Sequence, residues 1–299
     1  MVARTKPLTI FFITILLSLT PSSGTEAEEE RHCLWKVETQ QNTVYLLGSI
    51  HMLREEHYPL SPVIDEVFRQ VDIVVFETDL DSMNDPKIQG LILQRGMYLD
   101  GQTLKGNLSE ETYTLLEKWM HTSGMPVELF QVFKPTTVAI TLIVLEAQRL
   151  GFMPEYGIDN YFFKKSKEAG KEIRALEPPE FQIEFLFDLT DSEQEIYLQH
   201  TLMDMENLGR YVSGMVQAWQ IGDIDELVAL STEGIDEHPE IYQMYNRLNY
   251  QRNRNWLPRI EQMLKEERDF LIIVGALHLA GEKSVIDLLQ KKGYVLEQL

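Results

Sequence analysis

Short apolar runs near the two ends of the chain predict the strands of one sheet. Residues 34–38 alternate apolar and polar positions, and the run at 43–47 follows after a polar break, which is typical of a β-hairpin. The continuous apolar runs at 72–76 and 270–274 are typical of strands that are covered on both faces. We therefore expect both ends of the chain to contribute to a single central sheet.

The middle of the chain has mostly helical periodicity. Ser109 is the predicted N-cap of one helix, and only residues 172–176 interrupt the helices as a strand. This order predicts an α/β fold, in which a mixed central sheet built from both termini has flanking helices and a helical insertion or cap within about 109–250. Helices are predicted over 62–70, 110–121, 135–150, 158–169, 178–189, 192–219, 223–231, 253–267 and 282–291, and a last strand begins at 294.

The ends of two predicted strands share the pattern Gly-x-x-His. Gly48 precedes His51 after the first hairpin, and Gly275 precedes His278 after the strand at 270–274. Glycine lets the chain turn sharply, and the carboxyl ends of parallel strands form ligand sites in α/β sheets. If the two strands are parallel, both imidazoles reach the same edge of the sheet. The alternative for each histidine is a hydrogen bond within its own turn.

An acidic residue follows each of these histidines at the same offset. Glu55 lies four residues after His51, and Glu282 lies four residues after His278. Residues four apart share a face of a helix. If both segments turn helical, each His and Glu therefore form a pair on one helix face.

Other polar residues at element boundaries are also candidates for chemistry. Glu77 ends the strand at 72–76, where a partly buried carboxylate serves as a general base or a metal ligand, or else caps a turn. Asp159 opens the helix at 158–169, where it could also stabilise the helix dipole. Arg252 and Asn253 begin the helix before the second Gly-x-x-His, and the guanidinium there could bind a carboxylate or an oxyanion, or belong to a solvated face.

Composition narrows the partners and the kinds of site. The 299 residues include 47 acidic and 27 basic side chains, so the formal net charge of −20 repels a polyanion and argues against nucleic acid as a partner. The single cysteine, Cys33, excludes both an intramolecular disulfide and a Cys-rich zinc site. Any metal would therefore need His and carboxylate ligands. No linker divides the chain, so residues 28–299 are expected to form one domain.

The first residues have the pattern of a secretory signal peptide. Basic Arg4 and Lys6 precede an apolar run at 8–20, and small residues around Ala27 offer a cleavage site. We predict a signal peptide over 1–27 and a periplasmic or secreted mature protein. The alternative is an uncleaved membrane anchor with the rest of the chain outside the cytoplasm, and only in that case is the membrane a partner.

An ordered set of motifs resembles the TraB/PrgY/GumN family. The resemblance runs from about residue 33 to 297, and it extends to the Tiki metalloproteases and, more distantly, to erythromycin-esterase and ChaN-like proteins. The motifs are, in order, Leu46-Leu47-Gly48-Ser49-Ile50-His51, Val75-Phe76-Glu77, Lys134-Pro135, Tyr156-Gly157-Ile158-Asp159, Leu176-Glu177, Arg252-Asn253-Arg254-x-Trp256 and Val274-Gly275-Ala276-Leu277-His278-Leu279-Ala280-Gly281.

This resemblance implies an α/β/α core with a divalent-metal site formed by His51, His278 and Glu77. Such ligands can hold Mn²⁺, Co²⁺, Fe²⁺ or Zn²⁺ and activate a water molecule for hydrolysis. We expect a metal-dependent hydrolase of a peptide or protein substrate. In it, Asp159 is a further metal ligand, and Arg252 with Asn253 positions the substrate or stabilises the oxyanion.

The alternative function is a non-catalytic protein that sequesters a peptide or haem. Its groove would be lined by Met-containing segments at 202–205 and 215–216. Such segments are more often part of a hydrophobic core.

Overall fold

The computed structural model describes residues 31–233 and 239–299, so the predicted signal peptide at 1–27 lies outside the described residues. A six-stranded mixed sheet has the strand order β4-β3-β5-β2-β1-β6. The four strands from β4 to β2 are parallel, and β1 is antiparallel to both β2 and β6. The predicted α/β fold with a mixed sheet is confirmed. The strands are β1 (Leu34–Glu38), β2 (Thr43–Ser49), β3 (Ile73–Phe76), β4 (Glu172–Ala175), β5 (Phe270–Gly275) and β6 (Glu297–Gln298).

The register of the parallel strands places their carboxyl ends side by side. Strand β5 lies between β2 and β3, with Gly275 opposite Ser49 and Ile273 opposite Phe76. The apolar runs that predicted β3 and β5 are buried along almost their whole length, because helices cover both faces of these strands. The segments that follow β2, β3 and β5 therefore leave the sheet at one common edge.

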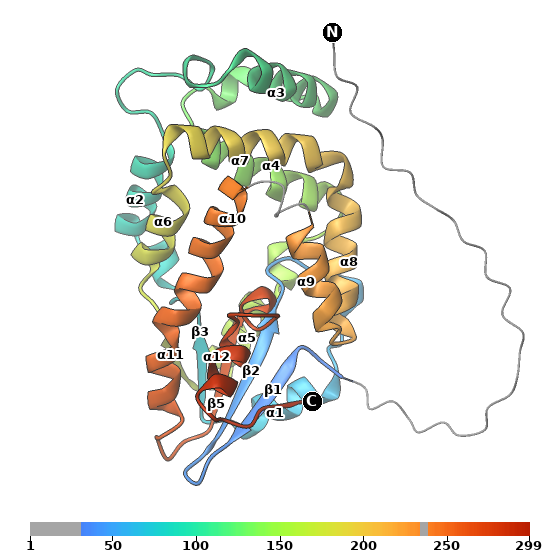
Figure 1. The fold of residues 1–299 in the computed structure, drawn as a ribbon, viewed down its shortest axis with the longest axis vertical. Coiled ribbons are helices and arrows are strands. Elements are labelled where there is room, and N and C mark those ends of the chain that lie inside the picture. The colour runs from blue at the N-terminus through green and yellow to red at the C-terminus, as the bar shows by residue number, and fades with distance from the viewer. Residues whose placement is uncertain (1–30, 234–238) are drawn as a thin grey trace, which may run out of the picture. The chain divides into compact units, whose positions relative to one another are not determined.

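Helices surround the sheet and form a layer beyond its carboxyl edge (Figure 1). Helices α1, α5, α11 and α12 lie beside the strands, whereas α3, α4 and α7 lie above the ends of the strands in Figure 1. The helices are α1 (Pro62–Gln70), α2 (Pro86–Gly96), α3 (Glu110–Ser123), α4 (Pro135–Arg149), α5 (Ile158–Glu168), α6 (Pro179–Phe187), α7 (Asp191–Asp204), α8 (Leu208–Gln220), α9 (Ile224–Thr232), α10 (Pro239–Tyr245), α11 (Arg252–Met263) and α12 (Val285–Lys291).

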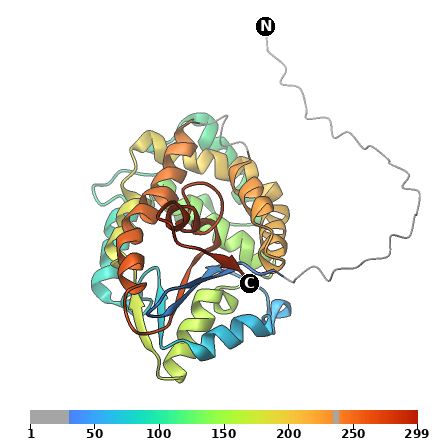
Figure 2. The ribbon, with the colours of Figure 1, turned by 60° about the horizontal axis from the view of Figure 1, so that its bottom comes forward.

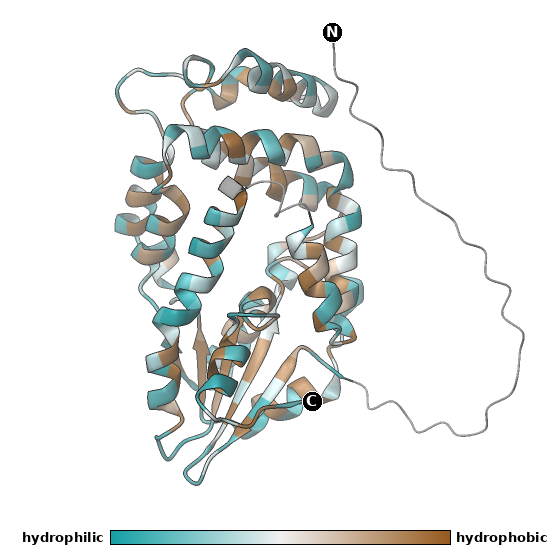
Figure 3. Ribbon diagram, in the orientation of Figure 1, coloured by the Kyte–Doolittle hydropathy of each residue, from teal (hydrophilic) through white to brown (hydrophobic). Residues whose placement is uncertain are grey.

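Two hydrophobic cores correspond to these two layers. The larger core lies around the sheet, whose strand β3 is strongly hydrophobic in Figure 3, and the helices around the sheet are seen from below in Figure 2. The smaller core joins α3, α4 and α7 through residues such as Leu116, Leu142 and Leu198. The interval 109–250 contains this second layer, but it also contains α5 and β4, which pack with the sheet.

The predicted helix boundaries differ from the structure where the chain changes layer. The single helix predicted over 192–219 is wrong, because a 3-10 turn over Met205–Asn207 divides it into α7, which packs on α4, and α8, which packs on α9. Helix α2 was not predicted, although Asp85 caps it by accepting a hydrogen bond from the Lys87 amide. Ser109 is the N-cap of α3, as predicted, and accepts a hydrogen bond from the Thr112 amide.

The predicted helical pairs after the two histidines are also wrong. After His51 the chain stays extended, because Leu53 forms a β-bridge with Met153, and only a short 3-10 turn begins at Glu55. After His278 the chain turns through Gly281 with a positive φ of 73°, and α12 begins only at Val285. Backbone pairing with a distant segment in the first case, and the turn through Gly281 in the second, therefore keep each His–Glu pair from sharing a helix face.

Candidate active site

The carboxyl ends of the four parallel strands carry the ionisable residues of the site. His51 follows β2, Glu77 follows β3, Glu177 follows β4 and His278 follows β5. Three of these residues were predicted from the sequence. Glu177 received no role, because its strand is short and partly exposed and offers no distinctive pattern.

The side chains of both histidines and Glu77 surround Gly275. A Cβ atom placed on Gly275 would lie 3.3 Å from Glu77 Oε1, 3.5 Å from His278 Cδ2 and 3.9 Å from His51 Nε2. The Gly275 amide also donates a hydrogen bond of 2.7 Å to Glu77 Oε1. The two Gly-x-x-His corners therefore converge beside one carboxylate, and the missing side chain of Gly275 leaves the space between them.

The His51 corner is open and charged. His51 Nδ1 lies 2.8 Å from Asp159 Oδ2, and Ser49 Oγ donates to the other Asp159 oxygen at 3.0 Å. The side chain of His51 is 68% exposed. The negative charge of the adjacent Asp159 carboxylate raises the pKa of His51 to about 9. Asp159 thus orients the imidazole in addition to lying in the first turn of α5.

A close backbone approach places Asp159 beside His51. A Cβ on Gly157 would lie only 2.1 Å from the His51 carbonyl oxygen, so a larger residue would force α5 away from the strand end. The Ile158 amide donates a hydrogen bond of 3.0 Å to the Ile50 carbonyl oxygen. The Gly-Ile-Asp sequence at 157–159 therefore allows α5 to begin directly against the loop that carries His51.

The His278 corner is closed and neutral. His278 is 5% exposed, and its ring packs against Trp256 with 4.5 Å between the ring centroids. Its Nδ1 donates to Asn253 Oδ1 at 2.7 Å, while Asn253 Nδ2 donates to the Lys283 carbonyl oxygen at 2.9 Å. Burial lowers the pKa of His278 to about 3. The ring is therefore neutral, and its Nε2 is an acceptor.

Arg252 connects this corner to two buried carboxylates. Its Nε and Nη2 atoms donate to Glu177 Oε1 at 2.9 and 2.6 Å, and Nη2 also donates to Glu77 Oε2. Its Nη1 lies 3.2 Å from His278 Nε2. Trp256 Nε1 donates to the second oxygen of Glu177 at 2.7 Å. Of the two alternatives for Arg252, binding of a carboxylate or a solvated face, the structure shows the first, and Arg252 is buried because Glu77 and Glu177 balance its charge.

The charge of Glu77 is fixed by these neighbours. Burial by itself would raise the pKa of the Glu77 carboxyl, but the positive charges of Arg252 and His51 and the Gly275 amide outweigh it and hold that pKa well below its usual range. Glu77 is therefore an anion throughout the neutral pH range. A carboxylate held in this state is a weak proton acceptor.

Gly48 has a packing role in the first corner. A Cβ there would lie 2.3 Å from Cys33 Sγ, so only glycine allows β1 and β2 to approach at this point. The Gly48 carbonyl oxygen accepts a hydrogen bond of 2.7 Å from Trp219 Nε1. Burial raises the pKa of Cys33 to about 12, so the thiol stays protonated.

A cavity of about 390 Å³ opens onto these residues. His51, Glu77, Asp159, Arg252 and Gln182 form its polar part. Gln182, which sequence reasoning missed, donates to Glu77 Oε2 at 3.2 Å. The other lining residues are mostly apolar and come from four segments: Phe76, Thr78 and Leu80 at and after the end of β3, Asn160 on α5, Phe185 and Leu186 on α6, and Leu248 in the π-helical turn Asn246–Gln251 before α11.

The residues around Gly275 are of the types that bind divalent metals in proteins. Both histidines direct Nδ1 to an oxygen acceptor, which is the usual support of a metal-binding imidazole that coordinates through Nε2. Arg252, however, contacts both His278 Nε2 and Glu77. Within residues 31–233 and 239–299, no group of three His, Cys, Asp or Glu side chains is already arranged around a single ion position.

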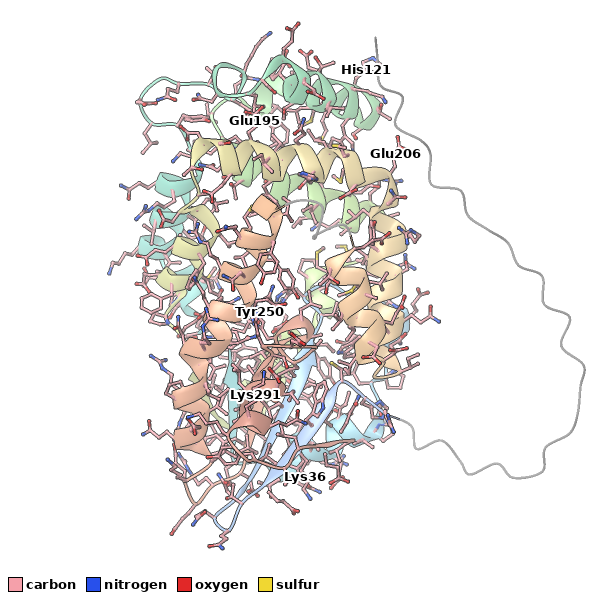
Figure 4. The ribbon with its side chains drawn as sticks, viewed as in Figure 1. Lys36, His121, Glu195, Glu206, Tyr250 and Lys291 are labelled. Carbon is pink, nitrogen blue, oxygen red and sulfur yellow. The ribbon has the colours of Figure 1, made fainter. Side chains whose placement is uncertain are left out.

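The Met-containing segments mainly serve packing. Leu202 and Met205 belong to the core between α3, α4 and α7, and Val216 belongs to the core around the sheet, whereas Met203 is exposed. His121, to which the sequence gave no role, lies at the end of α3, far from the strand ends (Figure 4).

Comparison with known protein families finds a match over nearly the whole described chain. The model of the TraB/PrgY/gumN family matches residues 33–298, nearly all of the described chain. The chain belongs to this family. The resemblance expected from the motifs is thereby confirmed. No solved structure matches the chain significantly.

Relatives of this TraB/PrgY/gumN family protein include an uncharacterised protein and metalloproteases. YbaP of Escherichia coli strain K12, an uncharacterised protein, is 27% identical over 251 residues, which cover 82% of this chain and 87% of YbaP. Metalloprotease TIKI1 of Xenopus tropicalis is 23% identical over 349 residues, covering 95% of this chain and 67% of TIKI1. Human metalloprotease TIKI1 is 21% identical over 317 residues, which cover 88% of this chain and 61% of human TIKI1. No helix among the described residues is long and apolar enough to cross a membrane.

Proposed function

We propose that this protein is a metal-dependent hydrolase that cleaves peptide bonds in the cavity at the carboxyl edge of the sheet. The observation that carries the proposal is the convergence of His51, His278 and Glu77 around Gly275, with an oxygen acceptor behind each imidazole. The similarity to proteins named as metalloproteases supports the same chemistry.

The ligands would be His51 Nε2, His278 Nε2 and the Glu77 carboxylate. Mn²⁺, Co²⁺, Fe²⁺ and Zn²⁺ all accept such a set, and a divalent metal of this kind lowers the pKa of a bound water molecule and polarises a carbonyl group. The low pKa of Glu77 favours the role of ligand over that of general base. Asp159 Oδ2 lies 2.8 Å from His51 Nδ1, the ring nitrogen that does not face the proposed ligand position, so we assign Asp159 to the orientation of His51.

Arg252 and Asn253 have different tasks in this proposal. Asn253 fixes the tautomer and the orientation of His278. Arg252 lines the cavity and presents a buried positive charge beside Glu77, where it can stabilise the negative charge that develops on the carbonyl oxygen of the substrate. Gln182 offers a second donor from α6 on the same side of Glu77.

We further propose that the protein acts in the periplasm or outside the cell, on a peptide or protein. The signal-peptide pattern of residues 1–27 supports this location, and an uncleaved anchor would place the same domain on the outer side of a membrane. The formal net charge of −20 supports a substrate other than nucleic acid.

Metal analysis and hydrolysis by the purified protein test this proposal. We expect a fluorescence-quenched peptide library to be cleaved, EDTA to abolish cleavage, and Mn²⁺ or Co²⁺ to restore it. The H51A variant should lose both bound metal and activity, whereas H121A, which removes a histidine far from the site, should keep both. Full activity in EDTA or in H51A would contradict the proposal. Stoichiometric binding of a peptide or of haem without turnover would indicate the sequestering function instead.

A further inference from the structure

We infer that the cavity contains an apolar subsite that holds a large uncharged side chain, such as Leu or Phe, of the residue beside the bond that is cleaved. The position relative to a cleaved bond rests on the proposed function. The selectivity of the cavity for apolar side chains does not.

Helix α6 forms one wall of this subsite. Gln182 on α6 contacts Glu77 at the polar end of the cavity, and Phe185 and Leu186 line the same cavity. These residues are three and four positions after Gln182, so they lie on the same helix face, about 5.4 Å further along the axis. The apolar wall therefore begins one helical turn from Gln182, the α6 residue that contacts the Glu77 carboxylate.

The segment before Arg252 repeats this arrangement. Leu248 lines the cavity four residues before Arg252, and its carbonyl oxygen accepts a hydrogen bond of 3.3 Å from Arg252 Nη1. Leu248 lies within the π-helical turn Asn246–Gln251 and Arg252 directly follows it, and this type of local distortion is frequent at functional sites. Each wall thus combines a polar side chain at the site with an apolar side chain one turn away.

The apolar walls have room to adjust. Phe185, Leu186 and Leu248 are only partly buried, and they also border a second small void of about 20 Å³ next to Met244. Side chains beside a void have lost part of their packing contacts. A bulky substrate group could restore these contacts by displacing the walls slightly towards the void.

Charge further restricts the substrate class. The side chains that line the apolar part, Leu80, Phe185, Leu186 and Leu248, offer no partner for a charged substrate group, and burial of an unpaired charge is strongly unfavourable. The net charge of −20 also repels acidic peptides at long range. The preferred substrate is therefore a neutral or basic peptide with a large apolar residue at the subsite.

Peptides built from Gly, Ser and Lys, with one variable residue, test this inference. Fluorescently labelled peptides with Leu, Phe, Ala or Asp at that residue are measured for binding by anisotropy in EDTA and for cleavage in Mn²⁺. We expect the Leu and Phe peptides to bind and to be cleaved at least ~10-fold better than the Ala peptide, with the Asp peptide weakest. The F185A and L248A variants, one from each wall, should reduce this preference. F181A, which removes an exposed aromatic ring from the same helix, should preserve it.

The outcomes separate the subsite from the hydrolytic function. Equal binding of the Leu, Phe and Ala peptides, or an unchanged preference in both F185A and L248A, would overturn the subsite. Selective binding without cleavage in any metal would overturn the proposed hydrolase and support the subsite. Cleavage without a preference for apolar residues would overturn the subsite alone.

Discussion

The two Gly-x-x-His corners have the same local pattern and opposite surroundings. His51 faces the cavity and has an acidic partner, Asp159, whereas His278 is buried against Trp256 and has an amide partner, Asn253. The first environment favours the charged imidazole and the second favours the neutral one. A repeated motif therefore placed two histidines at one site without giving them the same electrostatic state or the same structural importance.

The difference arises from the elements that cover each corner. Helix α5 meets the His51 loop only through its first turn, so the ring stays accessible. Helix α11 lies along the His278 corner and contributes Arg252, Asn253 and Trp256, of which Trp256 is almost completely buried. We therefore expect substitutions in the closed corner to affect folding, and substitutions in the open corner to affect mainly chemistry.

Loss of Arg252 should have the largest effect on stability. In R252A the buried carboxylates Glu77 and Glu177 lose their shared cation, and breaking a buried ion pair in this way typically costs ~3–5 kcal/mol in the free energy of unfolding. Urea denaturation followed by circular dichroism measures this change. R254A, which removes an exposed arginine two residues away, should change stability by at most ~0.5 kcal/mol. Equal effects of the two substitutions would show that the closed corner is not held by this pairing.

The next largest expected effect is a difference in stability between the variants of the two histidines. H278A leaves Asn253 Oδ1 without its donor and opens a space beside Trp256, which should destabilise the fold by ~2–3 kcal/mol. H51A removes a side chain that is largely exposed but is the ionic partner of Asp159, so its effect on the free energy of unfolding should be smaller, about 1 kcal/mol. The same urea titrations compare the two variants. Comparable destabilisation by both would contradict the distinction between the open and the closed corner.

A substitution in the open corner should instead change the affinity of the protein for a divalent metal. D159N keeps the size of the side chain but weakens its support of His51 Nδ1, and the loss of such support typically lowers metal affinity ~10–100-fold. Titration calorimetry with Mn²⁺ or Co²⁺ measures the affinity, and urea denaturation serves as the control for folding. D79N, which changes an acidic residue two positions beyond Glu77, should bind metal as the wild type does, since Asp79 contacts Asp81 and Ser82. Unchanged affinity in D159N would remove Asp159 from the site.

Much of the site could be predicted because it depends on local patterns. The apolar runs identified β2, β3 and β5, and the residues that follow a strand in a parallel sheet must leave at its carboxyl edge. That rule predicts that His51 and His278 reach the same edge, and the resemblance to the family adds Glu77 to them. The roles of Glu177 and Gln182 were missed because each depends on a partner far away in the chain, Arg252 for one and Glu77 for the other.

The sequence by itself determined the sheet, the two corners that carry histidine and the family. Only the tertiary structure decided that Arg252 is a buried cation shared by two carboxylates, that one histidine is open and the other closed, and that α6 supplies an apolar wall to the cavity. The physical reason is that strand patterns and turn residues act over a few neighbouring positions. Burial, the charge state of a group and the shape of a cavity are instead set by segments that meet only when the chain is folded.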